Sequence, residues 1–266
     1  MRAVFILCDG TVANGTALVN GLYEELPKDV ITSGGLAGDG ERFETTWVAD
    51  ENGMPTTGQI TAVGLYGDNI DINAGCQGGW DLFGPERIIT RSSGNVLYEI
   101  DHKPALELYK TYLGERASEL PASALLFPLA ISSGDEDRAP LVRTILGIDE
   151  EQNSLTFAGD VPEGWTAQLM RANLDHLVDG AYAAGTNLKL NTNHDTTLSV
   201  AISCVGRRLI LGQRAEEETE ALLDALPSAT RQIGFYSYGE LTPSGQLNCQ
   251  LHNQTMTVTT ISERRA

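Results

Sequence analysis

Hydrophobic residues along the first hundred positions fall into short runs that predict one lobe of mixed helix and sheet. The continuous apolar run over 3–8 is typical of a buried strand. Residues 15–26 repeat leucine and valine at helical spacing, which predicts a helix with one apolar face. Shorter runs predict further strands at 30–32, 43–47, 59–65, 70–73, 88–90 and 96–100.

A helix start after residue 100 marks the beginning of a second predicted lobe. Asp101 has the side chain of an N-cap, and Pro104 suits the first turn of a helix that we expect to end near Leu113. Later runs predict strands at 125–131, 142–148 and 155–157, and helices at 166–184 and 207–226.

These patterns predict an α+β fold of two lobes, each a mixed β-sheet with packed helices. We expect the domain boundary near residue 100, with one domain over 1–100 and the other over 101–262. The acidic run Glu216–Glu218 within the last predicted helix is interpreted as a solvated face.

Composition narrows the class of protein. The chain has 266 residues, enough for a substantial core, and its hydrophobic fraction of 41% is ordinary for a globular protein. The 28 glycines indicate many tight turns and hence a sheet-rich fold. A net charge of −18 opposes binding to nucleic acid and to anionic lipid. The simplest interpretation of this charge is that it keeps the protein soluble.

The four cysteines and the apolar runs bear on location. The cysteines are scattered without C-x-x-C spacing, which argues against a zinc ribbon or a disulfide framework. This pattern favours a reducing compartment, and we expect the protein to be cytoplasmic. No run approaches the roughly 18 apolar residues that a membrane span requires, so none is expected. No spacing of histidines or carboxylates predicts a metal centre.

Polar side chains of the last third are the strongest candidates for a binding site. Arg207 and Glu240 are the leading pair, because a guanidinium suits a ligand carboxylate and a carboxylate suits a ligand ammonium. The alternative is that each pairs inside the protein, since an unpaired buried charge is costly. Tyr236 and Tyr238 share a strand face and either wall a pocket or pack as core. The other candidates for this pocket are His252 and Asn253.

Two further residues, one glycine and one cysteine, are weaker candidates for the binding site. Gly35 lies in a glycine-rich loop without Gly-Lys-Ser/Thr and without a helix behind it, so it predicts a tight turn or a backbone contact to a ligand rather than a phosphate site. Cys204 is either a small buried residue or a thiolate helped by Arg207 and His252. Because no nucleophile–base pair is obvious, recognition is favoured over catalysis, and a Cys-dependent hydrolase is the alternative.

An ordered series of short motifs covers nearly the whole chain. The segments are 34–39, 79–85, 98–106, 143–147, 159–164, 204–208, 234–241 and 249–256. Taken in this order they resemble the FIST family, a bacterial and archaeal sensory module of signal-transduction proteins. Relatives of full length carry a further stretch before the position of Ala3, so the resemblance implies a truncated N-terminal part and a complete C-terminal part.

The resemblance implies a non-enzymatic sensory domain that binds a small ligand such as an amino acid. No transmitter segment is visible in this chain, so we expect the transmitter to be a separate signalling protein, such as a histidine kinase or chemoreceptor-type transmitter, or to lie on a part that is not present. Some members are thought to be haem-based sensors of gases such as nitric oxide, which makes His252, and less so His102, a candidate haem ligand. The pocket is expected between the lobes or inside the second one.

Overall fold

The computed structural model describes residues 1–120, 122–135, 140–190, 196–244 and 247–264. The chain forms two compact units. Unit 1 consists of Met1–Gly79 and Leu174–Ala266, and unit 2 consists of Trp80–Asn173. Each unit combines a mixed or antiparallel sheet with helices, so the predicted α+β fold of two lobes is confirmed. The two units are not the two predicted domains 1–100 and 101–262, and the predicted boundary near residue 100 stays a prediction.

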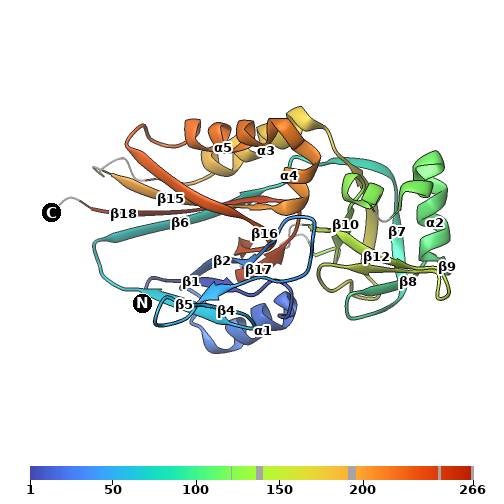
Figure 1. Ribbon diagram of the computed structural model, residues 1–266, viewed down its shortest axis with the longest axis horizontal. Coiled ribbons are helices and arrows are strands. Elements are labelled where there is room, and N and C mark those ends of the chain that lie inside the picture. The colour runs from blue at the N-terminus through green and yellow to red at the C-terminus, as the bar shows by residue number, and fades with distance from the viewer. Residues whose placement is uncertain (121, 136–139, 191–195, 245–246, 265–266) are drawn as a thin grey trace. The chain divides into compact units, whose positions relative to one another are not determined.

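Unit 1 is built on one curled sheet whose strand order is β5-β1-β2-β16-β15-β18-β6, with β17 paired to β16 (Figure 1). β1 runs parallel to β2, and β15 runs parallel to β16, whereas β2 and β16 are antiparallel. The strands are β1 (Ala3–Cys8), β2 (Ile31–Ala37), β5 (Ile60–Leu65), β6 (Ile70–Gln77), β15 (Thr197–Cys204), β16 (Thr230–Ser244), β17 (Leu247–His252) and β18 (Met256–Glu263). A separate hairpin pairs β3 (Val48–Ala49) with β4 (Pro55–Thr56).

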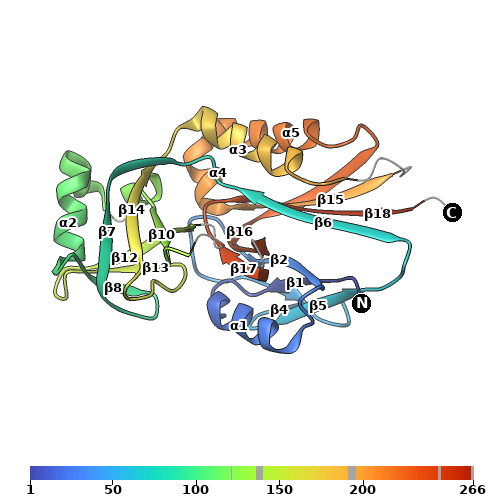
Figure 2. The ribbon, with the colours of Figure 1, turned by 180° about the vertical axis from the view of Figure 1, so that it is seen from behind.

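Helices of unit 1 cover the sheet at two places (Figure 2). The first helix packs on β1, β2 and β17 around Val19, Ile6 and Leu251, and Asn14 caps it by accepting a hydrogen bond from the Ala17 N–H. Two others pack on β15, β18 and β6 around Leu222, Ala184 and Val258. The helices are α1 (Gly15–Glu25), α3 (Leu174–Thr186), α4 (Val205–Leu211), the 3-10 turn η3 (Gly212–Arg214) and α5 (Ala215–Asp224).

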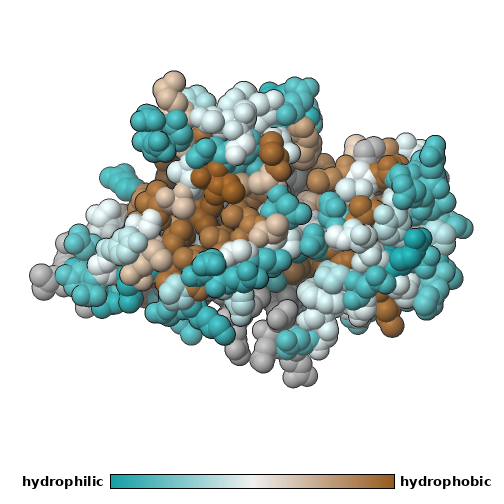
Figure 3. All heavy atoms as spheres, turned by 90° about the horizontal axis from the view of Figure 1, so that it is seen from below, coloured by the Kyte–Doolittle hydropathy of each residue, from teal (hydrophilic) through white to brown (hydrophobic). Residues whose placement is uncertain are grey.

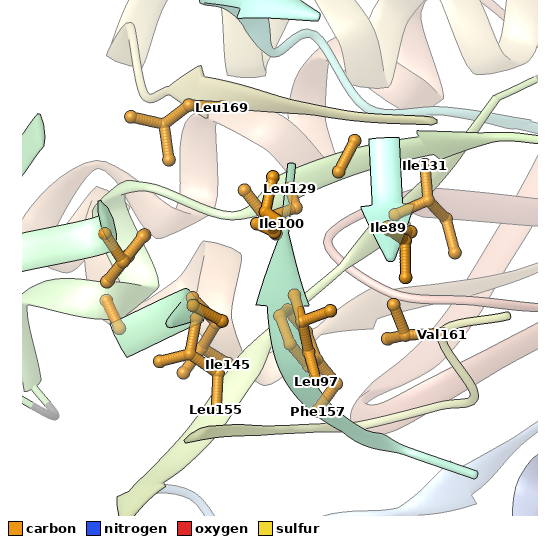
Figure 4. Close-up of a cluster of buried hydrophobic side chains, with 14 of the residues drawn as sticks. Ile89, Leu97, Ile100, Leu129, Ile131, Ile145, Leu155, Phe157, Val161 and Leu169 are labelled. Carbon is orange, nitrogen blue, oxygen red and sulfur yellow. The ribbon is translucent and has the colours of Figure 1, made fainter. Parts of the chain in front are cut away.

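Unit 2 has a second sheet, with the order β11-β10-β14-β7-β8-β13-β12 and β9 paired to β8. Its core is mostly aliphatic with a few aromatic side chains, and Figure 4 shows residues such as Ile89, Leu97 and Phe157 packed together. The strands are β7 (Asp81–Ser93), β8 (Val96–Ile100), β9 (Lys103–Pro104), β10 (Leu129–Ser132), β11 (Leu141–Arg143), β12 (Ile145–Asp149), β13 (Ser154–Phe157) and β14 (Thr166–Arg171). The helices are α2 (Ala105–Leu113) and the 3-10 turns η1 (Gly114–Glu119) and η2 (Ala122–Leu126).

Several local predictions were wrong. No strand forms over 43–47, because the Asp39 carboxylate accepts hydrogen bonds from the backbone N–H groups of Phe43, Glu44 and Thr45. The helix predicted over 166–184 is a strand, β14, followed by α3, because Thr166–Arg171 pairs with β10 and β7. The helix predicted over 207–226 is interrupted at Gly212, whose φ of 56° lies outside the helical region. Asp101 does not cap α2: its carboxylate accepts hydrogen bonds from the Ile88 N–H and from Arg87.

None of the helices in the described part of the chain has the length and the apolar run needed to cross a membrane. Within the same residues, no group of three or more histidine, cysteine and carboxylate side chains is arranged to hold a metal ion.

Candidate functional site

All eight side chains or backbone positions singled out from the sequence lie in unit 1. They come from β2, the end of β15, the start of α4, the middle of β16 and the turn after β17. Seven of the eight are buried and Tyr236 is half-buried, so burial rather than surface display is what they share. The residues are Gly35, Cys204, Arg207, Tyr236, Tyr238, Glu240, His252 and Asn253.

Arg207 is held by an internal ion pair. Its Nε donates to Glu218 Oε2 at 2.9 Å, and both side chains are 0% exposed. Its Nη2 donates to the Leu177 carbonyl at 2.7 Å, and its Nη1 donates to the Gly78 carbonyl. The guanidinium therefore links α4 to α5, α3 and the end of β6, and its carboxylate partner is Glu218 rather than Glu240.

Glu218 was missed by the sequence analysis, which interpreted the run Glu216–Glu218 as a solvated face. Glu216 and Glu217 are exposed as expected, but Glu218 is fully buried. Its second carboxylate oxygen accepts a hydrogen bond from Ser203 Oγ at 2.9 Å. The available signal was helical spacing, because Glu218 lies four residues before the fully buried Leu222 and shares its face.

Glu240 has its own set of hydroxyl partners. Ser237 Oγ donates to Glu240 Oε1 at 2.5 Å, and Thr255 Oγ1 donates to Glu240 Oε2 at 2.9 Å. Complete burial raises the pKa of the Glu240 carboxyl to about 8, although these hydrogen bonds and the more distant Arg207 act in the opposite direction. Glu240 is therefore largely protonated near neutral pH, which removes the fixed negative charge expected opposite a ligand ammonium.

His252 ends strand β17 and Asn253 follows it, close to Glu240, since His252 is the register partner of Glu240. His252 is 6% exposed, and its Nδ1 lies 4.0 Å from Cys76 Sγ. The Asn253 side chain is 0% exposed, and neither its oxygen nor its nitrogen has a hydrogen-bond partner among the described residues. His252 lines neither of the two hollows of unit 1 described below, so neither hollow places a haem against this side chain.

Cys204 lies at the end of β15 and is 3% exposed. Burial, and then the neighbouring Glu240, raise the pKa of its thiol well above the ordinary value. A thiol in this state is a poor nucleophile, so the site chemistry does not favour a Cys-dependent hydrolase. Gly35 lies within β2, and a Cβ at this position would approach Ile202 Cγ2 to 3.0 Å, so its glycine allows two strands to approach closely.

The two tyrosines do not share an environment, although they lie two apart on β16. Tyr236 contacts the helix side, where its hydroxyl donates to the Ala215 carbonyl at 3.2 Å. Tyr238 stacks on Phe43 with ring centroids 4.3 Å apart, and its hydroxyl donates to the Asp39 carboxylate. The register of β16 against β2 shifts between Ser237 and Gly239, so the regular alternation of the strand is broken at Tyr238.

A hollow of about 180 Å³ lies between α5 and the sheet, beside the Arg207–Glu218 pair. Polar groups line it together with apolar ones. Gln232 is one of the lining residues, and its buried side-chain oxygen has no partner among the described residues. Gln232 Nε2 donates to the Thr219 carbonyl at 2.9 Å, which ties the strand to the helix. The lining residues are Ala201, Ser203, Thr219, Gln232, Ile233, Gly234, Phe235, Tyr236 and Met256.

Only Tyr236 of this lining was predicted from the sequence. Ser203 and Gln232 follow from strand alternation once the register of β15 and β16 is known, because both point to the helix-covered face. The hollow is thus lined by one residue that the sequence analysis predicted and by polar residues that it did not predict.

The opposite face of the same strands is more apolar and more open. Register places Leu198 and Ile261 side by side, and Val200 beside Ile233, whose side chain is 64% exposed. A wider hollow of about 810 Å³ opens between the 66–69 segment and the ends of β15 and β18. Figure 3 views the molecule from below and shows apolar residues gathered in a recess of unit 1.

Comparison with known protein families gives two matches that together span most of the chain. The FIST N domain model matches residues 1–103, and the FIST C domain model matches residues 105–243. The chain matches no curated protein.

Proposed function

Because this chain belongs to the FIST family, whose domains are generally considered sensory, we propose that it binds a small ligand such as an amino acid and passes the bound state to a separate signalling protein. The observation that carries this proposal is the hollow between α5 and the sheet, which combines an apolar wall with the unpartnered Gln232 oxygen. Pockets for small molecules typically combine an apolar lining with a few placed polar groups.

The chemistry of the hollow favours a small ligand with both a hydrogen-bond donor and an apolar part. Gln232 Oε1 would accept a hydrogen bond from a ligand ammonium or amide, and Ser203 and Tyr236 offer hydroxyls nearby. Ala201 and Met256 would contact an apolar part of the ligand, because both lie on the same face of the sheet as Ser203. In this proposal Arg207 positions the site through Glu218 and does not bind the ligand carboxylate itself.

The same hollow offers a route to a signalling partner. Thr219 in its wall is adjacent in sequence to Glu218, and Glu218 holds both Ser203 and Arg207. Arg207 in turn binds carbonyl groups of α3 and of the end of β6. A ligand that displaces α5 therefore acts on a buried network that contacts three further elements. We propose a histidine kinase or a chemoreceptor-type transmitter as the partner that detects this change, and a cytoplasmic location for the chain.

A thermal-shift panel tests the proposal. The panel contains amino acids and small carboxylic acids, and a ligand that prefers the native state raises the melting temperature, with about 2.7 kcal/mol gained at a concentration one hundred times Kd. We expect at least one compound to do so. Gln232→Met should abolish the shift, whereas Arg231→Met, at the neighbouring exposed position outside the lining, should retain it.

A panel in which no compound stabilises the wild-type chain would contradict the proposal. Equal shifts in both variants would place the ligand elsewhere, with the predicted set around Glu240, His252 and Asn253 as the next candidate. Haem remains an additional compound for the panel, and a Soret band lost in His252→Ala would favour the gas-sensor alternative.

A further inference from the structure

The first half of β16 has a strand neighbour on one side only. Residues Thr230–Ser237 pair in parallel with β15, whereas pairing with β2 begins at Ser237 and continues to Leu241. On the β2 side, residues 230–236 therefore have no strand partner among the described residues. Figure 1 shows this half of β16 running beside β15 before the strand reaches β2. Backbone N–H and C=O groups along such an edge can pair with another extended chain.

This edge has few of the features that block strand pairing. Natural edges are protected by proline, by lysine or by a bulge, and 230–236 contains neither proline nor lysine. The register shift of β16 lies between Ser237 and Gly239, beyond the open stretch. Ile233 is 64% exposed in the middle of the edge, and it leaves an apolar side chain for a partner strand to cover.

Exposed carboxylates flank the edge on both sides. On α5, Glu216 and Glu220 are exposed, and the Thr219 carbonyl between them is bound by the side chain of Gln232. On the other side, the segment after β2 passes close to the Tyr236 carbonyl at Gly38, and it carries the exposed Glu41 and Glu44. The basic side chains nearby are Arg231 on the strand, Arg208, which lies over the Tyr236 ring, and Arg42, which pairs with Asp39.

We propose that the open edge of β16, residues 230–236, binds an extended basic segment of the signalling partner by strand addition. Main-chain hydrogen bonds supply the affinity in this mode, and side-chain pockets and charge supply the selectivity. Apolar residues at alternate positions of the segment cover Ile233, and its lysine or arginine residues face the flanking carboxylates. The signalling role of this contact rests on the proposed function, because the same stretch of β16 lines the hollow behind α5.

A synthetic heptapeptide of sequence Lys-Val-Thr-Val-Thr-Val-Lys, capped at both ends, is the probe. We expect it to bind the full chain and to slow amide exchange of the edge-facing residues within 230–236 by about tenfold or more. Two N-methylated versions, each blocking the N–H groups of one edge of the peptide, provide the matched controls. The version that is methylated on the pairing edge should lose binding, and the other should keep it.

A charge variant provides a second measurement. Ile233→Lys should weaken binding of the basic peptide about tenfold or more, by repulsion and by loss of the apolar contact. Val63→Lys, at a comparably exposed apolar position of 54% on β5, should leave binding unchanged. A peptide with glutamate in place of lysine should bind more weakly than the basic one.

Three outcomes would overturn the proposal: equal binding of both N-methylated peptides, protection confined to other strands, or peptide-free dimers that protect these same amides. The last outcome would assign the edge to a second copy of the chain. These failures are distinct from failure of the ligand proposal, because the thermal-shift panel requires no peptide. A ligand shift without peptide binding would leave the sensory function intact.

Discussion

Arg207 and Glu218 form a fully buried ion pair that joins α4 to α5, with 2.9 Å between Nε and Oε2. Removing one charge from such a pair leaves the other buried without compensation, which costs about 3–5 kcal/mol. We therefore expect Glu218→Gln to lower the free energy of unfolding by about that amount, measured by urea denaturation.

The control is the preceding residue. Glu217→Gln changes the same chemical group on the same helix, but Glu217 is exposed and pairs with Arg214 at the surface. Its substitution should leave the denaturation midpoint nearly unchanged. Similar losses for the two variants would mean that the buried pair does not stabilise the fold.

Glu240 should make stability fall as pH rises. Its folded pKa of about 8 lies above the ordinary value near 4.3, so between these values the unfolded chain has lost a proton that the folded chain still binds. The contribution is fully present below about pH 4 and is lost by about pH 8, with a slope of at most about 1.4 kcal/mol per pH unit.

Glu240→Gln removes this titration and should flatten the profile, measured by chemical denaturation at intervals from pH 5 to 8. Glu220→Gln, at an exposed position of α5, is the control and should keep the wild-type slope. Parallel profiles for wild type and Glu240→Gln would show that the carboxyl is ionised in the folded chain.

Gly234 allows β16 to lie against β15. A Cβ at this position would come within 1.8 Å of the Ala201 carbonyl oxygen, so a side chain must push the two strands apart. We expect Gly234→Ala to cost about 1–3 kcal/mol or more, measured by thermal unfolding. Gly21→Ala in α1 is the control: its Cβ meets nothing within 4 Å, and alanine should gain up to about 1 kcal/mol there.

The thiols should be inert in the folded chain. Cys8, Cys204 and Cys249 are at most 3% exposed, and burial raises the pKa of Cys249, like that of the half-buried Cys76, to about 12. We expect an aromatic disulfide reagent at neutral pH to label them only after unfolding. Fast labelling that disappears in Cys204→Ala would instead support the hydrolase alternative.

The local hydrophobic pattern predicted the elements whose burial follows directly from their own sequence. The strand at Ala3–Cys8 matches its predicted position because its continuous apolar run is buried, and the helix at Gly15–Glu25 matches because it has one apolar face. The strand Thr166–Arg171 was misassigned, because its apolar positions fit a helical as well as an alternating period. Only its pairing with two distant strands decides between them.

The sequence analysis identified which polar residues are buried more successfully than it identified their hydrogen-bond and ion-pair partners. Arg207 is buried and paired, as the salt-bridge alternative anticipated, but the sequence does not reveal that Glu218 rather than Glu240 faces it. That choice depends on how α4 and α5 pack on β15. Whether the eight predicted residues bind a ligand stays a prediction, and the hollow lined by Tyr236 gives it a specific place to be tested.

The division of unit 1 into two distant stretches has a consequence for the order of assembly during synthesis on the ribosome. Unit 2 is continuous and is complete once Asn173 has emerged. β2 and β6, by contrast, gain their partners β16 and β18 only when the last stretch of the chain has been translated. The N-terminal strands must therefore wait with incomplete pairing while the middle of the protein folds, which makes that interval the one in which a nascent-chain chaperone would matter most.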